Sequence, residues 1–511
     1  MFQLRVNNLL SKKQAIEGKT YPPMIYDSEN KRTIGFNKIE LSKYLNARGF
    51  VYANAGGKDG RGALYRLDAD MRYHEATSKD LRDELIGYLA DTIPNKDIRS
   101  ALLIDTENVF NSLFYIENEE YNIARGELLA SDPRYDCRGY EDTAFIPALN
   151  GLVKIPYYVE DLNQWFSDGM GEIYPYQRDL FYPAERGYSF VYEPLSMDPN
   201  VLFADDNPYY ALYKSVIEDK RVLEYVLMYF ATVIFAPIVY QWTFWFTGEG
   251  GSGKSSIFKG IHAILGPLCS SAKYKDLIDR FGLSNIAGKR LNICDDGDLA
   301  DVNITSLVKA LSQSSDIQVQ YKGKDFRTIT NTANLMFISN SFPNFVPDSA
   351  IRRRLQLVEL NTVDKDVYLF DKFDRPDCVN WLFNACLYYW DKIKDVPPNE
   401  VVMLSENIPS MVLAKNEFMK MDSVYYWLRM DYDIDPYDKN AVRSMIRERP
   451  IKEVYADYED CVINEQGESP LSDKKLSKRL FAEYRLESYP ATRMGQSIRV
   501  YKDRSAQGGK T

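Results

Sequence analysis

Histidine is scarce in this 511-residue sequence, which contains only His74 and His262, far apart in the chain. A zinc centre, a nickase site or a primase pocket that depends on histidine is therefore not expected. Asp68 and Asp70 resemble half of a two-metal site, but no third carboxylate follows in a matching context. A turn at the end of a strand is the favoured interpretation of that pair.

Cysteine pairs and export signals are also missing. The six cysteines include no C-x-x-C pair, which argues against zinc ribbons and disulfide frameworks and fits a reducing compartment. No secretory signal precedes the polar segment 7–19, so we expect a protein of the bacterial or host cytoplasm.

Long apolar runs and excess positive charge are equally lacking. The one long apolar stretch, 225–240, has Pro237 near its end and a charged segment, 218–224, before it. This pattern is typical of a buried helix that ends before a strand, and we expect no membrane span. The net charge of −10 repels nucleic acid over the whole surface, so DNA binding would require local basic elements.

One motif that is present has a known chemistry. Residues Gly248 to Ser255 (GEGGSGKS) fit the phosphate-binding pattern G-x-x-x-x-G-K-[ST]. The glycines let backbone N–H groups face a polyphosphate, Lys254 supplies a charge for the β and γ phosphates, and the Ser255 hydroxyl can ligate Mg²⁺. A glycine-rich surface turn would fit the pattern alone. The buried strand predicted at 242–247 and the helical spacing after Lys254 favour nucleotide binding. The expected nucleotide contacts are Gly248, Glu249, Gly250, Gly251, Ser252, Gly253, Lys254, Ser255 and Ser256.

Two later strand ends supply polar groups. Asp295 and Asp296 follow the apolar run 291–294, so Asp295 would hold Mg²⁺ and Asp296 would orient the attacking water. An acidic turn is the alternative. Asn340 ends a further apolar run, 335–339, where it could hydrogen-bond the γ phosphate or the water, although an ordinary turn asparagine also fits.

Three consecutive arginines, Arg352, Arg353 and Arg354, precede another apolar strand pattern. A guanidinium against a γ phosphate stabilises the charge of phosphoryl transfer, and in a ring it would reach the neighbouring subunit's nucleotide. We expect Arg353 or Arg354 to act in this way. A solvated basic face is the alternative.

In this order, the motifs resemble those of the superfamily 3 helicases, in the branch of phage, plasmid and poxvirus primase-helicases. The similarity covers roughly residues 150–422 and includes the phosphate loop, Asp295 with Asp296, and Ser339-Asn340. It implies an α/β fold with an AAA+-like P-loop ATPase core and a helical N-terminal region. Two departures are serines before Asp316 in place of Gly-Gly, and Asp-Asp where many members have one glutamate, but no required functional group is lost.

The resemblance also gives a role to the basic segment 320–327. The residues alone predict a β-hairpin with a basic tip, which could be a plain surface hairpin. In related rings such hairpins enter the central channel, which implies that Lys322, Lys324 and Arg327 contact the backbone of single-stranded DNA.

The C-terminal part predicts a winged helix. A helix at 472–481 carries basic residues, and an alternating strand pattern follows at 496–501. Duplex DNA is the expected ligand, with a protein adaptor role as the alternative. The candidate DNA contacts on the helix are Lys474, Lys475, Lys478 and Arg479.

A chain of this length exceeds one hydrophobic core, and its motifs divide it into units. We expect a small α+β module of unknown role at 1–100, an accessory or helical collar region at 101–205, the ATPase core at 206–362, a helical subdomain at 363–422 and the winged-helix-like domain at 423–511.

Together these features predict an ATP-dependent, Mg²⁺-requiring replicative DNA helicase of a phage or other mobile element. It would assemble as a homo-oligomeric ring, with a hexamer favoured, and act on single-stranded and forked DNA with 3′ to 5′ polarity by resemblance. A primase or other replication proteins would be partners. The alternatives are a ring ATPase that remodels or loads proteins, and a DNA-binding initiator whose ATPase switches assembly.

Overall fold

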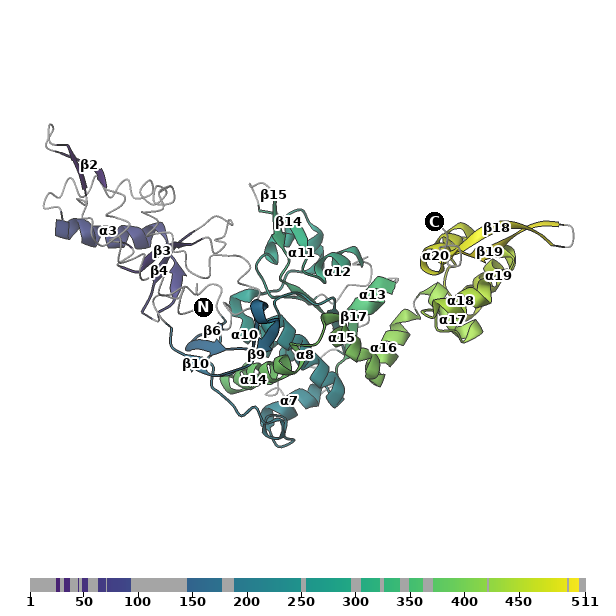
Figure 1. Cartoon of the computed structure of the whole chain (residues 1–511), viewed down its shortest axis with the longest axis horizontal. Coiled ribbons are helices and arrows are strands. Elements are labelled where there is room, and N and C mark those ends of the chain that lie inside the picture. Colours follow the sequence, from purple (N-terminus) through teal and green to yellow (C-terminus); the bar gives the residue numbers. More distant parts are fainter. Residues whose placement is uncertain are drawn as a thin grey trace.

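The computed structural model describes much of the central and C-terminal chain and shorter N-terminal stretches (Figure 1). The described residues are 24–27, 32–36, 45, 48–53, 63–69, 71–92, 145–176, 188–249, 254–295, 305–321, 326–340, 349–361, 371–420, 422–493 and 496–504.

A five-stranded sheet lies at the centre. Its strand order is β12-β13-β16-β11-β17, and every neighbouring pair is parallel. The strand that leads into the phosphate loop, β11, therefore lies between β16 and β17. The strands are β11 (Thr243–Thr247), β12 (Cys269–Ser270), β13 (Leu291–Asp295), β16 (Asn334–Ser339) and β17 (Leu355–Glu359). The α/β fold with a P-loop ATPase core is thus confirmed, as are the strands predicted around it.

Helices cover both faces of this sheet, because alternate side chains of a strand point to opposite faces. Phe244 and Phe246 of β11 pack on one side, in an apolar cluster with buried side chains of several helices. Among those helices are α8 (Lys220–Phe235), α10 (Lys259–Leu265) and α14 (Pro376–Ile393). The helix α14 lies within the helical subdomain expected at 363–422.

Trp245, between those two phenylalanines, packs on the opposite face. Its cluster includes Phe337 of β16, whose ring stacks on the Trp245 indole at 4.7 Å between centroids. Helices covering this face are α11 (Tyr274–Ile278), α12 (Thr305–Leu311), α13 (Ser349–Arg354) and α16 (Pro409–Met419). The remaining elements of this body are α6 (Pro199–Leu202), α7 (Pro208–Val216), α9 (Lys254–Ile257), η7 (Gly266–Leu268), η8 (Gly282–Asn285), β14 (Asp316–Gln320), β15 (Phe326–Thr330), α15 (Pro398–Met403) and η10 (Leu404–Asn407).

The apolar stretch 225–240 supplies most of α8. The Asp219 side chain caps this helix by accepting from Arg221 N, and the helix ends before Pro237. Nearly all of its apolar side chains are buried against the sheet and α14, as a core helix requires. Among the described residues, no helix is long and apolar enough to cross a membrane.

Short strands precede the ATPase core. A two-residue turn, Leu149-Asn150, joins β6 (Phe145–Ala148) to β7 (Gly151–Lys154), a loop length that is common in hairpins. In the accessory region expected at 101–205, the described residues form mainly strands and loops. Their helical turns are η5 (Glu160–Leu162) and α6. The other elements here are β8 (Tyr157–Val159), η5 (Glu160–Leu162), β9 (Gln164–Phe166) and β10 (Ile173–Tyr174).

The N-terminal elements include the predicted strands and helix. They are β1 (Met24–Asp27), β2 (Arg32–Phe36), β3 (Phe50–Ala53), β4 (Ala63–Leu67), β5 (Tyr73–Glu75) and α3 (Ser78–Thr92).

The C-terminal body has its own apolar core and the predicted helices followed by a hairpin. Residues 448–450 pair with β19, which adds a short third strand beside the hairpin. This arrangement is winged-helix-like. Its elements are α17 (Ser423–Tyr432), α18 (Lys439–Ile446), α19 (Ile451–Cys461), η11 (Val462–Gln466), α20 (Asp473–Tyr484), β18 (Leu486–Arg493) and β19 (Gln496–Asp503).

Candidate nucleotide site and DNA interfaces

The carboxyl ends of β11, β13 and β16 meet at one edge of the sheet, because all three strands are parallel. Ligands of open α/β sheets bind outside this edge. Lys254 begins α9 directly after the loop, and its ammonium donates to the carbonyl oxygens of Gly248 at 2.5 Å and Glu249 at 2.7 Å. Gly250, Gly251, Ser252 and Gly253 lie outside the described residues.

The structure brings the two predicted metal ligands together across the sheet. The Ser255 hydroxyl donates to Asp295 Oδ2 at 3.2 Å, although the two residues are far apart in sequence. A hydroxyl and a carboxylate are oxygen donors of the kind that Mg²⁺ prefers, so this pair fits a magnesium site. Burial lowers the pKa of the Lys254 ammonium, and the charge of Asp295 opposes that shift. Asp296 lies outside the described residues.

Asn340 follows β16, the strand next to β11, and its side chain is exposed at the same edge. The preceding residue is tied to the phosphate-loop strand, because the Trp245 indole N–H donates to the Ser339 hydroxyl at 2.7 Å. This buried contact fixes the position of Asn340 along the strand direction, relative to the phosphate loop that follows β11. Sequence reasoning missed the contact, since Ser339 looked like part of an apolar strand. Ser256, the last predicted nucleotide contact, is half-buried in α9.

The arginines lie at the opposite edge. Residues Arg352 to Arg354 end α13 and lead into the amino end of β17, where Leu355 pairs with Thr243 at the start of β11. The phosphate loop begins after the last residue of the five-residue strand β11, so it lies roughly 17 Å further along the strand direction, at about 3.3 Å per residue. An arginine side chain does not span that distance.

Each of the three arginines has a different environment, because consecutive helical residues point about 100° apart. Arg353 is exposed and donates to Gln241 Oε1 at 3.0 Å. Arg354 is 8% exposed. Arg352 is half-buried, with its guanidinium carbon 3.4 Å from the centre of the Tyr437 ring in the C-terminal body. Arg353 is therefore the arginine of this segment that is most accessible to another molecule.

The hairpin predicted from the basic segment is present as β14 and β15, which pair from Asp316 with Thr330 to Gln320 with Phe326. Lys322 and Lys324, at its tip, lie outside the described residues. Arg327 pairs with Val319 near that end of the hairpin.

Arg280 joins this hairpin from the segment after α11, a contact that sequence reasoning missed. Its Nε donates to Gln320 Oε1 at 2.7 Å, and its guanidinium lies 5.6 Å and 5.9 Å from the ring centres of Phe281 and Phe326. Phe326 is 56% exposed. Exposed aromatic and arginine side chains at a hairpin can stack with bases. One feature of the sequence could have indicated this contact, because Arg280-Phe281 places a cation next to an aromatic ring in a polar segment.

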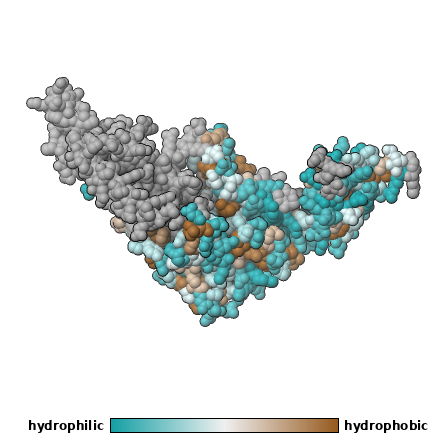
Figure 2. Space-filling view, in the orientation of Figure 1, coloured by the Kyte–Doolittle hydropathy of each residue, from teal (hydrophilic) through white to brown (hydrophobic). Residues whose placement is uncertain are grey.

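The predicted DNA-contacting helix is α20. Lys474, Lys475 and Lys478 are all exposed on it, and Figure 2 shows a mainly hydrophilic face over the C-terminal body. An exposed row of lysines suits phosphate contacts.

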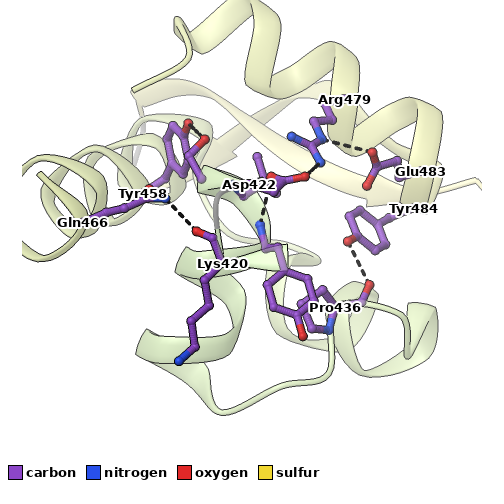
Figure 3. Close-up of polar contacts among 11 residues, drawn as sticks. Lys420, Asp422, Pro436, Tyr458, Gln466, Arg479, Glu483 and Tyr484 are labelled. Carbon is purple, nitrogen blue, oxygen red and sulfur yellow. Dashed lines mark hydrogen bonds and ion pairs between the residues drawn. The ribbon is translucent and has the colours of Figure 1, made fainter. Parts of the chain in front are cut away.

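Arg479 corrects the prediction made for this helix. It forms an ion pair with Asp422, which is 1% exposed, and its Nε donates to Glu483 Oε1 at 3.0 Å (Figure 3). Burial would lower the pKa of the Arg479 guanidinium, but the charge and hydrogen bond of Asp422 raise it above its ordinary value. Arg479 has a structural role because a buried carboxylate requires its charge.

Comparison with known proteins gives distant matches. Residues 246–354 match a protein family described as a family of unknown function (DUF5906). No curated protein matches the chain. Three similar solved structures are of the C-terminal region of NrS-1. The apo structure of its region 305–718 is 15% identical, covers 91% of this chain and 99% of that chain, and has a TM-score of 0.45.

A second structure of NrS-1 region 305–718, an A form apo structure, is 14% identical with the same coverage and TM-score. An A form apo structure of the NrS-1 C-terminal region is 15% identical, covers 69% of this chain and 86% of that chain, and has a TM-score of 0.39. Similarity at this level does not define a function, which must be inferred from the residues of this chain.

Proposed function

We propose that the protein is an ATP-driven DNA helicase that works as a homo-oligomeric ring. The observation that carries this proposal is the separation of two half-sites on one sheet. The phosphate loop lies at the carboxyl edge, and the exposed Arg353 lies at the amino edge. A complete site for phosphoryl transfer then requires Arg353 of a second copy.

On the carboxyl edge, Lys254 neutralises the β and γ phosphates of ATP, and Ser255 and Asp295 hold Mg²⁺. When bound, Mg²⁺ neutralises charge on the phosphates. Asp296 and Asn340 orient the attacking water from the ends of two strands. Arg353 of the neighbouring subunit stabilises the charge that develops on the γ phosphate, so hydrolysis depends on assembly.

Nucleotide-dependent movement reaches DNA through the β14–β15 hairpin. Lys322 and Lys324 contact the phosphates of one strand, and Arg280 with Phe326 supports them from the last residue pair before the hairpin turn. The lysines of α20 bind duplex DNA ahead of the fork. By resemblance to superfamily 3 helicases, translocation runs 3′ to 5′ in a replication complex of a phage or mobile element.

Fork unwinding tests this function against its alternatives. We expect Lys254→Ala to abolish ATP hydrolysis and unwinding, and Lys322→Ala with Lys324→Ala to keep hydrolysis and lose unwinding. If neither change affects strand separation, the helicase proposal fails. A protein-remodelling ATPase would hydrolyse ATP with no unwinding by the wild type, whereas an initiator would bind duplex DNA and assemble on ATP without unwinding.

A further inference from the structure

An arginine–tyrosine stack joins the ATPase core to the C-terminal body. The Arg352 guanidinium carbon lies 3.4 Å from the centre of the Tyr437 ring, which belongs to the segment between α17 and α18. The buried Arg352 Nε has no hydrogen-bond partner among the described residues. A desolvated cation needs compensation, and the face of the aromatic ring provides it here.

Tyr437 itself is fixed by its surroundings. Its backbone N–H donates to Asp435 Oδ1 at 3.0 Å, and the Tyr425 ring lies 5.7 Å away between centroids. Burial raises the pKa of the Tyr437 hydroxyl, and the half-buried ring contacts Tyr425 on its own body and Arg352 on the ATPase core. The neighbouring Pro436 carbonyl accepts from the Tyr484 hydroxyl of α20 at 2.8 Å, a contact drawn in Figure 3.

The helix that bears Arg352 depends on such contacts. α13 contains six residues, Ser349–Arg354, and a helix of that length is not stable alone in water. Ile351 is fully buried on one side, and the Tyr437 stack holds the next residue, Arg352. Arg353 follows on the same turn and faces solvent.

We propose that Tyr437 is a positioning residue for ATP hydrolysis. By holding Arg352, it fixes the turn of α13 that presents Arg353 to the neighbouring subunit's nucleotide. This inference rests on the proposed function. It also makes the C-terminal body part of the catalytic assembly, since α20 contacts the Tyr437 segment through Tyr484.

Steady-state ATP hydrolysis by the full-length assembled protein tests the inference. We expect Tyr437→Leu to lower kcat by about 10²-fold, as misplacement of a catalytic group by about 1 Å does, with the KM for ATP unchanged. Tyr437→Phe keeps the ring face and should retain wild-type kcat. Arg353→Ala should lose kcat, and adding Tyr437→Leu to it should cause no further loss, because both changes remove the same contribution.

The matched control is Tyr432→Leu. Tyr432 also lies under an arginine, with the Arg449 guanidinium 5.8 Å from its ring centre, but this pair is contained within the C-terminal body. We expect Tyr432→Leu to keep kcat. Native mass spectrometry and thermal unfolding report assembly and folding of each variant. Should Tyr437→Leu fail to assemble, Arg352→Met removes the stack from the other side and is expected to give the same loss of kcat.

The outcomes separate the two proposals. If Arg353→Ala loses kcat while the assembled stack variant keeps it, the positioning role is overturned and the proposed function stands. A further loss when Tyr437→Leu is added to Arg353→Ala also overturns the positioning role, since Tyr437 would then act elsewhere. If Arg353→Ala keeps kcat in an assembled ring, both proposals fail.

Discussion

The two edges of the central sheet differ in how their residues are held. At the carboxyl edge, the Lys254 ammonium donates to two carbonyls of the loop, and the Ser255 hydroxyl donates to Asp295. At the amino edge, the three arginines point to three environments, and one of them is stacked on the C-terminal body. The residues proposed to bind phosphate and metal at the first edge are therefore held largely by each other and by their own loop, whereas the second edge is organised by the rest of the chain.

Arg353→Ala is expected to give the largest effect. It should lower kcat by about 10³-fold or more, as for other arginines that reach a γ phosphate from outside the site. Binding of a fluorescent ATP analogue should stay at the wild-type level, because the phosphate loop lies at the other edge. Arg429→Ala is the matched control, since Arg429 forms only an exposed pair with Asp433 among the ion pairs of the described residues. Equal losses of kcat in both variants would contradict the separation of the edges.

Arg479→Met is expected to destabilise the C-terminal body by about 3–5 kcal/mol, because it leaves the buried Asp422 carboxylate without its charge partner. Asp422 also caps α17 by accepting from Val424 N and Tyr425 N, so the junction with the ATPase core should loosen. Urea unfolding measures the change. Arg429→Met, which removes the exposed pair with Asp433 in the same body, should cost about 1 kcal/mol or less. A similar cost for both would show that the Arg479 pair is an ordinary surface contact.

Asp295→Asn is expected to lower kcat by about 10²-fold, which corresponds to about 2.7 kcal/mol. The amide cannot supply the carboxylate charge that Mg²⁺ requires, so the Mg²⁺ concentration for half-maximal hydrolysis should rise. A magnesium titration of ATP hydrolysis reads out both changes. Asp276→Asn, an exposed carboxylate on α11, serves as the control. An unaltered magnesium titration for Asp295→Asn would remove this residue from the metal site.

Lys322→Ala with Lys324→Ala is expected to give the smallest effect on ATP hydrolysis, although unwinding should be lost. The salt dependence of single-stranded DNA binding should fall by about two counterions, with ATP hydrolysis in the absence of DNA unchanged. Lys474→Ala with Lys475→Ala should instead weaken duplex binding. Binding titrations with single-stranded and duplex DNA across a range of salt concentrations distinguish the two variants. If the hairpin variant instead lost duplex binding and the α20 variant lost single-strand binding, the ligands proposed for the two basic elements would be wrong.

The sequence predicted the carboxyl edge well, because its signals are local. An apolar strand followed at once by polar residues defines β11, β13 and β16, and parallel pairing then brings Ser255 to Asp295. The amino edge was harder. The sequence alone does not distinguish the three adjacent arginines, Arg352, Arg353 and Arg354. Their environments differ because of Tyr437 and because of the register of β17 with β11. Arg479 looked like a DNA contact because its buried partner, Asp422, lies in another element.

Subunit mixing tests the shared site most directly. Lys254→Ala subunits keep Arg353, and Arg353→Ala subunits keep the phosphate loop, so each variant alone should be inactive. In a mixed ring, about a quarter of the interfaces should join an intact loop to an intact arginine, and ATP hydrolysis should return. Hydrolysis that stays at the level of the separate variants, although native mass spectrometry detects mixed rings, would contradict a nucleotide site shared between subunits.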